Sequence, residues 1–214
     1  MPKPLHPPSE SCLSVHGLEC IRGDRLLFSG LDFELNAGEL LHVLGTNGSG
    51  KTSLLRILCG LLPAENGEIR WCGRPVAEQR SAYLQDLAYL GHHPGIKGEL
   101  TPLENLHLLR RLYRIRPDAD PAALLAEAGL GRHLDVPART LSAGQRQRIG
   151  LTRLRLQQAR LWILDEPFTS LDVAGVAWVE ALLEAHLQAG GLAVLTSHQS
   201  LQRVANVRTL TLGT

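Results

Sequence analysis

Cysteine, aromatic side chains and long apolar runs are all scarce in this sequence. Aromatic residues make up 4% of the 214 residues, and the four cysteines form no C-x-x-C pair. This spacing favours reduced core thiols in a cytosolic protein over a disulfide framework, with a metal or redox site as the less favoured alternative. No apolar run reaches the ~20 residues that a membrane-spanning helix needs, so attachment to a membrane would depend on partners.

The sequence also lacks a strong charge of either sign. Its formal net charge is +1, which gives no basic footprint of the kind typical of nucleic-acid binding. Residues 1–11 are proline-rich and lack an apolar core, so we expect a disordered tail and not a signal peptide. The remaining residues, 12–214, suit one domain with a substantial insertion.

A glycine-rich loop is the most informative motif. Gly45, Gly50, Lys51 and Thr52 have the spacing G-x-x-x-x-G-K-[ST], between a short apolar run and leucines at helical spacing. We expect backbone N–H groups and the positive end of the following helix to surround a phosphate group. Lys51 would reach the β- and γ-phosphates of a nucleotide, and Thr52 would bind Mg²⁺. A glycine-rich turn that matches by chance is the weaker alternative.

The flanking patterns predict an α/β fold, in which an antiparallel β layer leads into a parallel sheet. The expected strands lie at 13–18, 31–35, 68–72, 87–90, 161–164 and 192–196. A leucine-rich stretch from 101 to about 132 has helical spacing that includes Tyr113, and Pro102 marks its start. Pro117 and Pro121 separate it from a second helix at 122–129, and further helices are expected from about 144 and at 173–188.

Polar residues follow two of these strands and should meet at one edge of the sheet. Asp165 and Glu166 end the strand at 161–164; we expect Asp165 near the Mg²⁺ and Glu166 beside the attacking water. His198 follows the strand at 192–196 and would touch the γ-phosphate and the water. The structural alternatives are two acids that cap a strand and a surface or core histidine. Ser142 precedes a small-residue turn and predicts a helix N-cap that presents free N–H groups to an anion.

In this order, the motifs resemble those of the ATP-binding subunits of ABC transporters. Walker A spans 45–52, the signature LSAGQ spans 141–145, Walker B ends at Asp165 and Glu166, the D-loop spans 170–172, and His198 is the switch histidine. The resemblance implies a RecA-like P-loop NTPase with a helical insertion at about 97–143, which hydrolyses ATP with Mg²⁺. It also implies a head-to-tail dimer that encloses two ATP molecules.

Each ATP would then lie between two copies of the chain. The residues that the resemblance places at ATP are Gly45, Thr46, Asn47, Gly48, Ser49, Gly50, Lys51, Thr52 and Ser53 of one copy and Ser142, Ala143, Gly144 and Gln145 of the other. Lys51, Glu166 and His198 are the expected catalytic residues, and Thr52 and Asp165 the expected metal site, with Asp165 acting through water.

Two positions depart from the family pattern. Arg22 occupies the place of an aromatic residue that stacks on adenine; a guanidinium can also lie on a purine face, and Phe28 is the competing candidate. His92 occupies the place of a glutamine that contacts Mg²⁺ and the attacking water. A histidine accepts a hydrogen bond only when it is neutral, so this catalytic and metal contact would be sensitive to pH.

Three segments, FSGLDFELNAGE, GHHPGIK and RLWILDEPFTSLDVAGV, resemble one subgroup, the ATP-binding subunits of cytochrome c biogenesis haem exporters. The resemblance implies a peripheral subunit on the cytoplasmic face of the inner membrane, which powers haem export or release of a haem-loaded chaperone. Residues 92–100 and the insertion would dock on integral membrane subunits of the cytochrome c maturation complex.

Three alternatives stay open: an ATPase for another small-substrate transporter, a nucleotide-switched scaffold without turnover, and a soluble ABC ATPase that acts on nucleic acid. Candidate residues for a nucleic-acid face are Arg146, Arg148, Arg153 and Arg155. No nucleic-acid partner is expected, because the chain neither joins two ATPase units nor carries a basic footprint.

Overall fold

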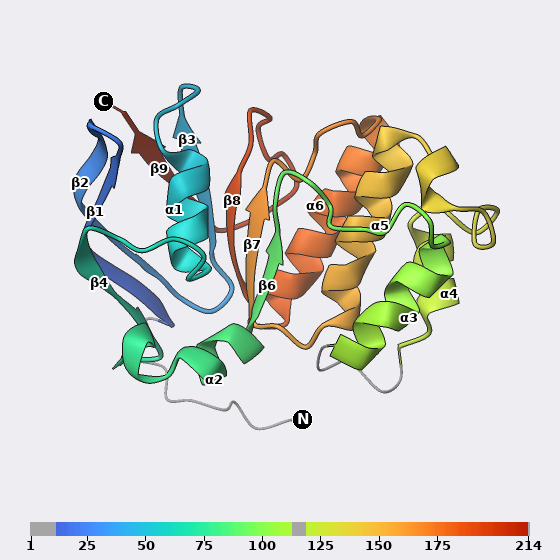
Figure 1. The fold of residues 1–214 in the computed structure, drawn as a ribbon, viewed down its shortest axis with the longest axis horizontal. Coiled ribbons are helices and arrows are strands. Elements are labelled where there is room, and N and C mark those ends of the chain that lie inside the picture. The colour runs from blue at the N-terminus through green and yellow to red at the C-terminus, as the bar shows by residue number, and fades with distance from the viewer. Residues whose placement is uncertain (1–11, 113–118, 214) are drawn as a thin grey trace.

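An antiparallel sheet forms the first layer of the fold. The computed structural model describes residues 12–112 and 119–213 (Figure 1). Strands β1 (Leu13–Arg22) and β2 (Arg25–Leu35) form a hairpin around Gly23 and Asp24, and β4 (Asn66–Trp71) pairs with the other edge of β1. The short strand β5 (Arg74–Pro75) completes the order β2-β1-β4-β5.

A parallel sheet with the order β6-β7-β8-β3-β9 forms the second layer. Its strands are β3 (Leu40–Gly45), β6 (Leu87–Leu90), β7 (Leu161–Asp165), β8 (Leu192–Thr196) and β9 (Val207–Leu212). Every residue of β7 and β8 is buried, as both faces of the sheet are covered. The expected antiparallel layer and parallel sheet are confirmed.

Two apolar layers cover the parallel sheet, one on each face. Leu161 and Ile163 of β7 pack with α1 (Lys51–Leu58) and the antiparallel sheet. The alternate residues, Trp162 and Leu164, pack with α5 (Ala143–Leu156) and α6 (Val173–Gln188). Because side chains alternate along a strand, the one apolar run of β7 serves both layers.

The helical insertion has an apolar core of its own. It contains α3 (Pro102–Leu112) and α4 (Pro121–Glu127), whose Leu106 and Leu125 pack against Ile149 of α5. Thr101 and Glu104 exchange side-chain hydrogen bonds with each other's backbone N–H groups, so α3 begins where the sequence predicts. In Figure 1 this unit lies beside α5, away from the antiparallel sheet.

Most expected elements are observed within a few residues. The bounds at 87–90, 173–188 and 192–196 agree with the structure, whereas helix α2 (Arg80–Gln85), strand β9 and 3₁₀ turns at Val76–Glu78 and Ala138–Thr140 were not predicted. Tyr113, Pro117 and the tail at 1–11 lie outside the described residues. Across 12–112 and 119–213, no helix combines the length and apolarity needed to cross a membrane.

Candidate nucleotide site

The loop between β3 and α1 depends on glycine. Gly45, Gly48 and Gly50 have φ angles of 148°, 80° and 104°, which residues with side chains rarely adopt. A Cβ atom on Gly45 would lie 2.4 Å from Ser49 Oγ and 2.6 Å from the Leu212 carbonyl oxygen. The loop therefore approaches both itself and β9 too closely for any side chain at Gly45.

This loop directs several hydrogen-bond donors toward one place. Lys51 Nζ donates to the carbonyl oxygens of Gly45 at 2.7 Å and of Thr46 at 3.1 Å, so the ammonium group lies over the loop. Gly50 caps α1 without a side-chain hydrogen bond, and the first turn of α1 holds no acidic residue. Ser49 Oγ, by contrast, is buried against Gly45 and has no partner among the described residues. Unpaired donors at a helix N-terminus, beside a lysine, suit a phosphate chain.

Oxygen atoms from three elements meet beside this loop. Thr52 Oγ1, in the first turn of α1, donates to Asp165 Oδ1 at 3.4 Å. Thr196 Oγ1, at the end of β8, donates to the same oxygen at 2.8 Å. Asp165 is only 4% exposed. A hydroxyl and a carboxylate at this separation are hard oxygen ligands, which fit Mg²⁺.

Glu166 and His198 lie next to each other at the same edge of the sheet. Glu166 has a φ of 52°, and its N–H donates to Thr196 O at 3.2 Å and to Thr196 Oγ1 at 3.0 Å. These bonds hold the backbone in a left-handed turn that directs the carboxylate away from β7. Glu166 Oε1 lies 3.7 Å from His198 Nε2, so a carboxylate and an imidazole both face the site.

One cavity of about 640 Å³ collects these groups. Its lining includes Lys51 and Thr52 from α1, Asp165 and Glu166 from the end of β7, and both expected histidines, His92 and His198. The structure thus brings together Lys51 and His198, which are 147 positions apart in the sequence. Leu27, Arg56 and Thr169 also line the cavity and were not predicted, because no motif of the sequence includes them.

The residue that would stack on adenine stays a prediction. Arg22 ends β1 and pairs with Arg25 across the hairpin; it does not line the cavity, whereas Leu27 does. Phe28 is buried, and a Cβ on Gly50 would lie 3.1 Å from its Cδ1 atom, so its ring supports the phosphate-binding loop. Of the two hairpin candidates, neither lines the cavity.

The signature stretch begins helix α5, as predicted. Ser142 Oγ accepts a hydrogen bond from the Gln145 N–H at 3.1 Å, and Gln145 Oε1 accepts one from the Ser142 N–H at 2.8 Å, which is a capping box. Ser142 and Ala143 are exposed, and neither lines the cavity of their own chain. A Cβ on Gly144 would lie 2.4 Å from the Ser170 carbonyl oxygen, so Gly144 is needed where α5 meets the D-loop.

The arginines of α5 are bound within the chain. Arg146 donates to Leu141 O, and Arg153 donates to Pro94 O and Tyr89 O. Arg148 donates to Ala128 O and, at 2.5 Å, to Asp172 Oδ1. Arg155 pairs with Glu127. These contacts connect α5 to its neighbours and give the nucleic-acid alternative no support.

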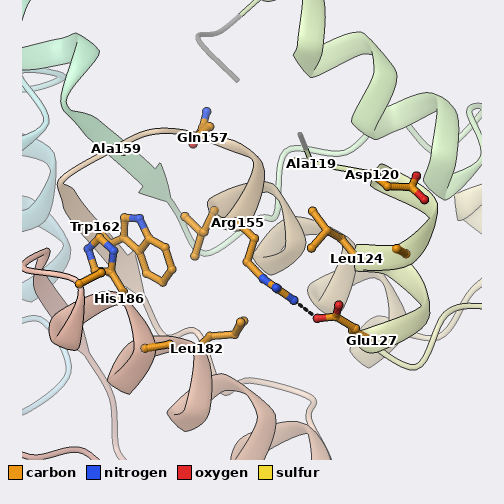
Figure 2. Close-up of a pocket in the computed structure, with 14 residues that line it drawn as sticks. Ala119, Asp120, Leu124, Glu127, Arg155, Gln157, Ala159, Trp162, Leu182 and His186 are labelled. Carbon is orange, nitrogen blue, oxygen red and sulfur yellow. Dashed lines mark hydrogen bonds and ion pairs between the residues drawn. The ribbon is translucent and has the colours of Figure 1, made fainter. Parts of the chain in front are cut away.

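A second cavity, of about 480 Å³, lies between α4, α5 and α6 (Figure 2). The rings of Trp162 and His186 form one wall, stacked with centroids 3.8 Å apart at an interplanar angle of 8°. Arg155 extends along another wall to reach Glu127, as Figure 2 shows. None of the residues expected to contact the nucleotide or the metal lines this cavity, so the first cavity is the candidate active site.

The fold and the first cavity define a P-loop ATPase of the ABC class. The sequence pattern described as ABC transporter matches residues 28–169, and the chain belongs to the ABC transporter family. It is 53% identical to the cytochrome c biogenesis ATP-binding export protein CcmA of Methylococcus capsulatus, over 96% of this chain and all of that one. It is 50% identical to the protein of the same name from Dechloromonas aromatica, over 94% of this chain and all of that one.

A solved structure agrees with this assignment. The structure described as the ATP-binding subunit of an ABC transporter superposes with a TM-score of 0.77 at 25% identity, covering 88% of this chain and 80% of that one. The expected P-loop NTPase fold and the resemblance to ABC transporter subunits are therefore confirmed. The chain is an ATP-hydrolysing enzyme whose activity is coupled to transport.

Proposed function

We propose that this chain powers an export complex of cytochrome c biogenesis by hydrolysing ATP at a site that two copies share. The observation that carries the catalytic part is the single cavity lined by Lys51, Thr52, Asp165, Glu166 and His198. The biological part is supported by relatives at 48–53% identity, each called a cytochrome c biogenesis ATP-binding export protein. The process that this resemblance implies is haem export or release of a haem-loaded chaperone.

The triphosphate of ATP would replace the carbonyl contacts of Lys51. Its ammonium group already lies over the loop, bonded to Gly45 O and Thr46 O, and a phosphate oxygen would be a stronger, charged acceptor. The uncapped N–H groups of α1 would donate to the same phosphates. Thr52 and Asp165 would hold Mg²⁺, which, when bound, neutralises negative charge on the phosphates.

Hydrolysis needs a water molecule in line with the bond to the γ-phosphate. The carboxylate of Glu166 would accept a proton from this water. His198, whose Nε2 lies 3.7 Å from Glu166 Oε1, would donate to a γ-phosphate oxygen. His92 lines the same cavity and would be a further polar contact for the water. Lys51 would stabilise the charge that develops on the leaving phosphate of ADP, since preorganised charge is the main contribution to phosphoryl transfer.

A second copy would complete the site with its signature stretch. The exposed Ser142 and Ala143 lie outside the cavity of their own chain. The N-terminus of α5 in the second copy would present its N–H groups to the γ-phosphate from the opposite side.

Integral membrane subunits would dock at the loop before α3, holding the chain on the cytoplasmic face of the inner membrane. Asn105 fixes this loop, because its Oδ1 accepts from the Lys97 N–H at 2.7 Å and its Nδ2 donates to Lys97 O at 3.0 Å. A groove of about 160 Å³ beside it is lined by Ile96, Lys97, Leu108 and Leu109. Apolar residues with one exposed cation suit an amphipathic cytoplasmic helix that carries an acid.

The Glu166→Gln substitution tests the catalytic assignment. The amide keeps the shape of the side chain but cannot accept the proton, so we expect ATP to bind normally and turnover to fall by about 100-fold or more. Phosphate release by the assembled complex and ATP binding by the purified chain are the measurements. The exposed Glu65→Gln serves as a matched control that should retain full activity. Near-normal turnover of Glu166→Gln would refute the role of Glu166.

A further inference from the structure

Two cysteines lie together at one end of the antiparallel sheet. Cys12 directly precedes β1 and Cys72 directly follows β4, next to the paired residues Leu13 and Trp71. The Cys72 N–H donates to Cys12 O at 2.8 Å. Cys72 begins the turn that follows β4, and the two side chains share a hydrogen bond that couples their titration. Both thiols are free and only partly buried.

One guanidinium group covers both sulfur atoms. Arg160 Nη1 lies 3.6 Å from Cys72 Sγ, and Arg160 Nη2 lies 3.8 Å from Cys12 Sγ. The guanidinium stacks over the Trp71 ring at 5.2 Å and lies 3.8 Å from Asp86 Oδ2. Arg160 is therefore held in place by its neighbours, and its charge is directed at the thiols.

This environment makes the two thiols unequal. A hydrogen bond from Cys72, then the charge of Arg160 and an N–H group of Ala37, lower the pKa of Cys12 to about 6 against the opposing effect of burial. The same hydrogen bond and burial raise the pKa of Cys72. At neutral pH Cys12 is thus the thiolate, which is the nucleophilic form, and Cys72 keeps its proton.

We propose that Cys12 and Cys72 are a peroxide-sensitive pair that forms a reversible disulfide. The Cys12 thiolate attacks the terminal oxygen of a hydroperoxide, the O–O bond breaks, and Cys12 becomes a sulfenic acid. The leaving alkoxide or hydroxide takes a proton from solvent and departs as an alcohol or water. Cys72, freed from its hydrogen bond to the thiolate, loses its proton beside Arg160 and attacks the Cys12 sulfur. Hydroxide leaves and takes up that proton as water, so two thiols are oxidised as one peroxide is reduced.

The other two cysteines lack these features. Cys20 is fully buried and Cys59 is 4% exposed. Burial, and then the charge of Asp165, raise the pKa of Cys59. A peroxide should therefore select the Cys12 and Cys72 pair.

The pair is also remote from the nucleotide. Arg160 directly precedes β7, whereas Asp165 ends that strand at the active site. Helix α2 ends next to Asp86, the partner of Arg160. In Figure 1 this helix lies at the end of the sheet opposite the loop that precedes α1. Substitution of either cysteine should therefore leave basal ATP turnover unchanged.

The test is oxidation of the full chain by hydrogen peroxide, followed by peptide mass spectrometry without reduction. We expect one linked peptide that joins Cys12 to Cys72, lost again on treatment with dithiothreitol. In Cys72→Ser the resolving thiol is missing, and dimedone should label a sulfenic acid at Cys12. Links formed only between chains, or the absence of both the link and the dimedone label, would overturn the proposal.

A second measurement separates reactivity from mere proximity. The rate at which iodoacetamide alkylates Cys12 should be half-maximal near pH 6 in the wild type. In Arg160→Gln and in Cys72→Ala, which removes the hydrogen-bond donor, the midpoint should move upward, and alkylation at pH 7 should slow by about tenfold. Arg160→Lys keeps a cation and should show a smaller change. A wild-type midpoint near the ordinary ~8.5 of a free thiol would also overturn the proposal.

Discussion

Thr196 connects the two acids of the hydrolysis site through one hydroxyl group. Its Oγ1 donates to Asp165 Oδ1 at 2.8 Å and accepts from the Glu166 N–H at 3.0 Å. Thr196 is fully buried, so water cannot replace either bond. One side chain thus orients both the carboxylate of the metal site and the residue that would activate water.

The Thr196→Val substitution removes this hydroxyl and keeps the shape of the side chain. Asp165 would lose a buried donor, so we expect turnover to fall by about tenfold and the free energy of unfolding by about 1–3 kcal/mol. Steady-state phosphate release and urea unfolding measure the two effects. Thr196→Ser keeps the hydroxyl and should restore most of the activity. Wild-type turnover in the valine variant would show that the hydroxyl is dispensable.

For single residues, the sequence predicts the site residues that belong to motifs. It misses the site residues whose position depends on how two strands pair. Lys51, Thr52 and Asp165 follow from spacing and from the strand ends, and the structure brings them together. Thr196 reads as the last residue of an apolar strand, and only its register opposite Asp165 shows its role. Leu27 reaches the cavity because of the hairpin register, which no local pattern determines.

Among the elements, the buried strands and long helices are the most predictable. Helix α6 and strand β8 have the expected bounds because their apolar patterns end at clear turn signals. Helix α2 has six residues and one buried side chain, Tyr83, which is too little for a periodic pattern. Strand β9 lies at the sheet edge and is largely exposed, which leaves it without a buried apolar run. Its valine and threonines favour a strand, so β propensity could have predicted it.

The loop before α3 permits a test of docking at the element scale. Lys97 is exposed, while its backbone is fixed by Asn105. Lys97→Glu should therefore leave the loop intact but repel an acidic partner helix, weakening co-purification with the membrane subunits. Lys97→Arg keeps the charge and should co-purify normally. Unchanged assembly of the glutamate variant would exclude this surface as the charged contact.

For the whole molecule, the exposed signature stretch and the separate cavity predict a shared active site. Lys51→Met should disable Walker A, and Ser142→Asp should place a negative charge against the γ-phosphate while keeping a good helix cap. Each variant alone should be inactive. A mixed dimer would combine the intact Walker A of one chain with the intact signature of the other.

Mixing the two variants in equal amounts should therefore restore activity. We expect roughly a quarter of wild-type turnover, because half of the dimers are mixed and one of their two sites is intact. The measurement is phosphate release by the mixture and by each variant alone. If the signature acted within its own chain, the mixture would stay inactive.

The place of β3 in the parallel sheet determines when the protein can first bind a nucleotide during synthesis. Strand β3 carries the phosphate-binding loop, but its two neighbours are β8 and β9. These neighbours are translated some 150 residues after it, and the Leu212 carbonyl oxygen of β9 lies against Gly45. A nascent chain with a finished Walker A sequence thus lacks the sheet that shapes it. Nucleotide binding should appear late, only after residue 212 has left the ribosome.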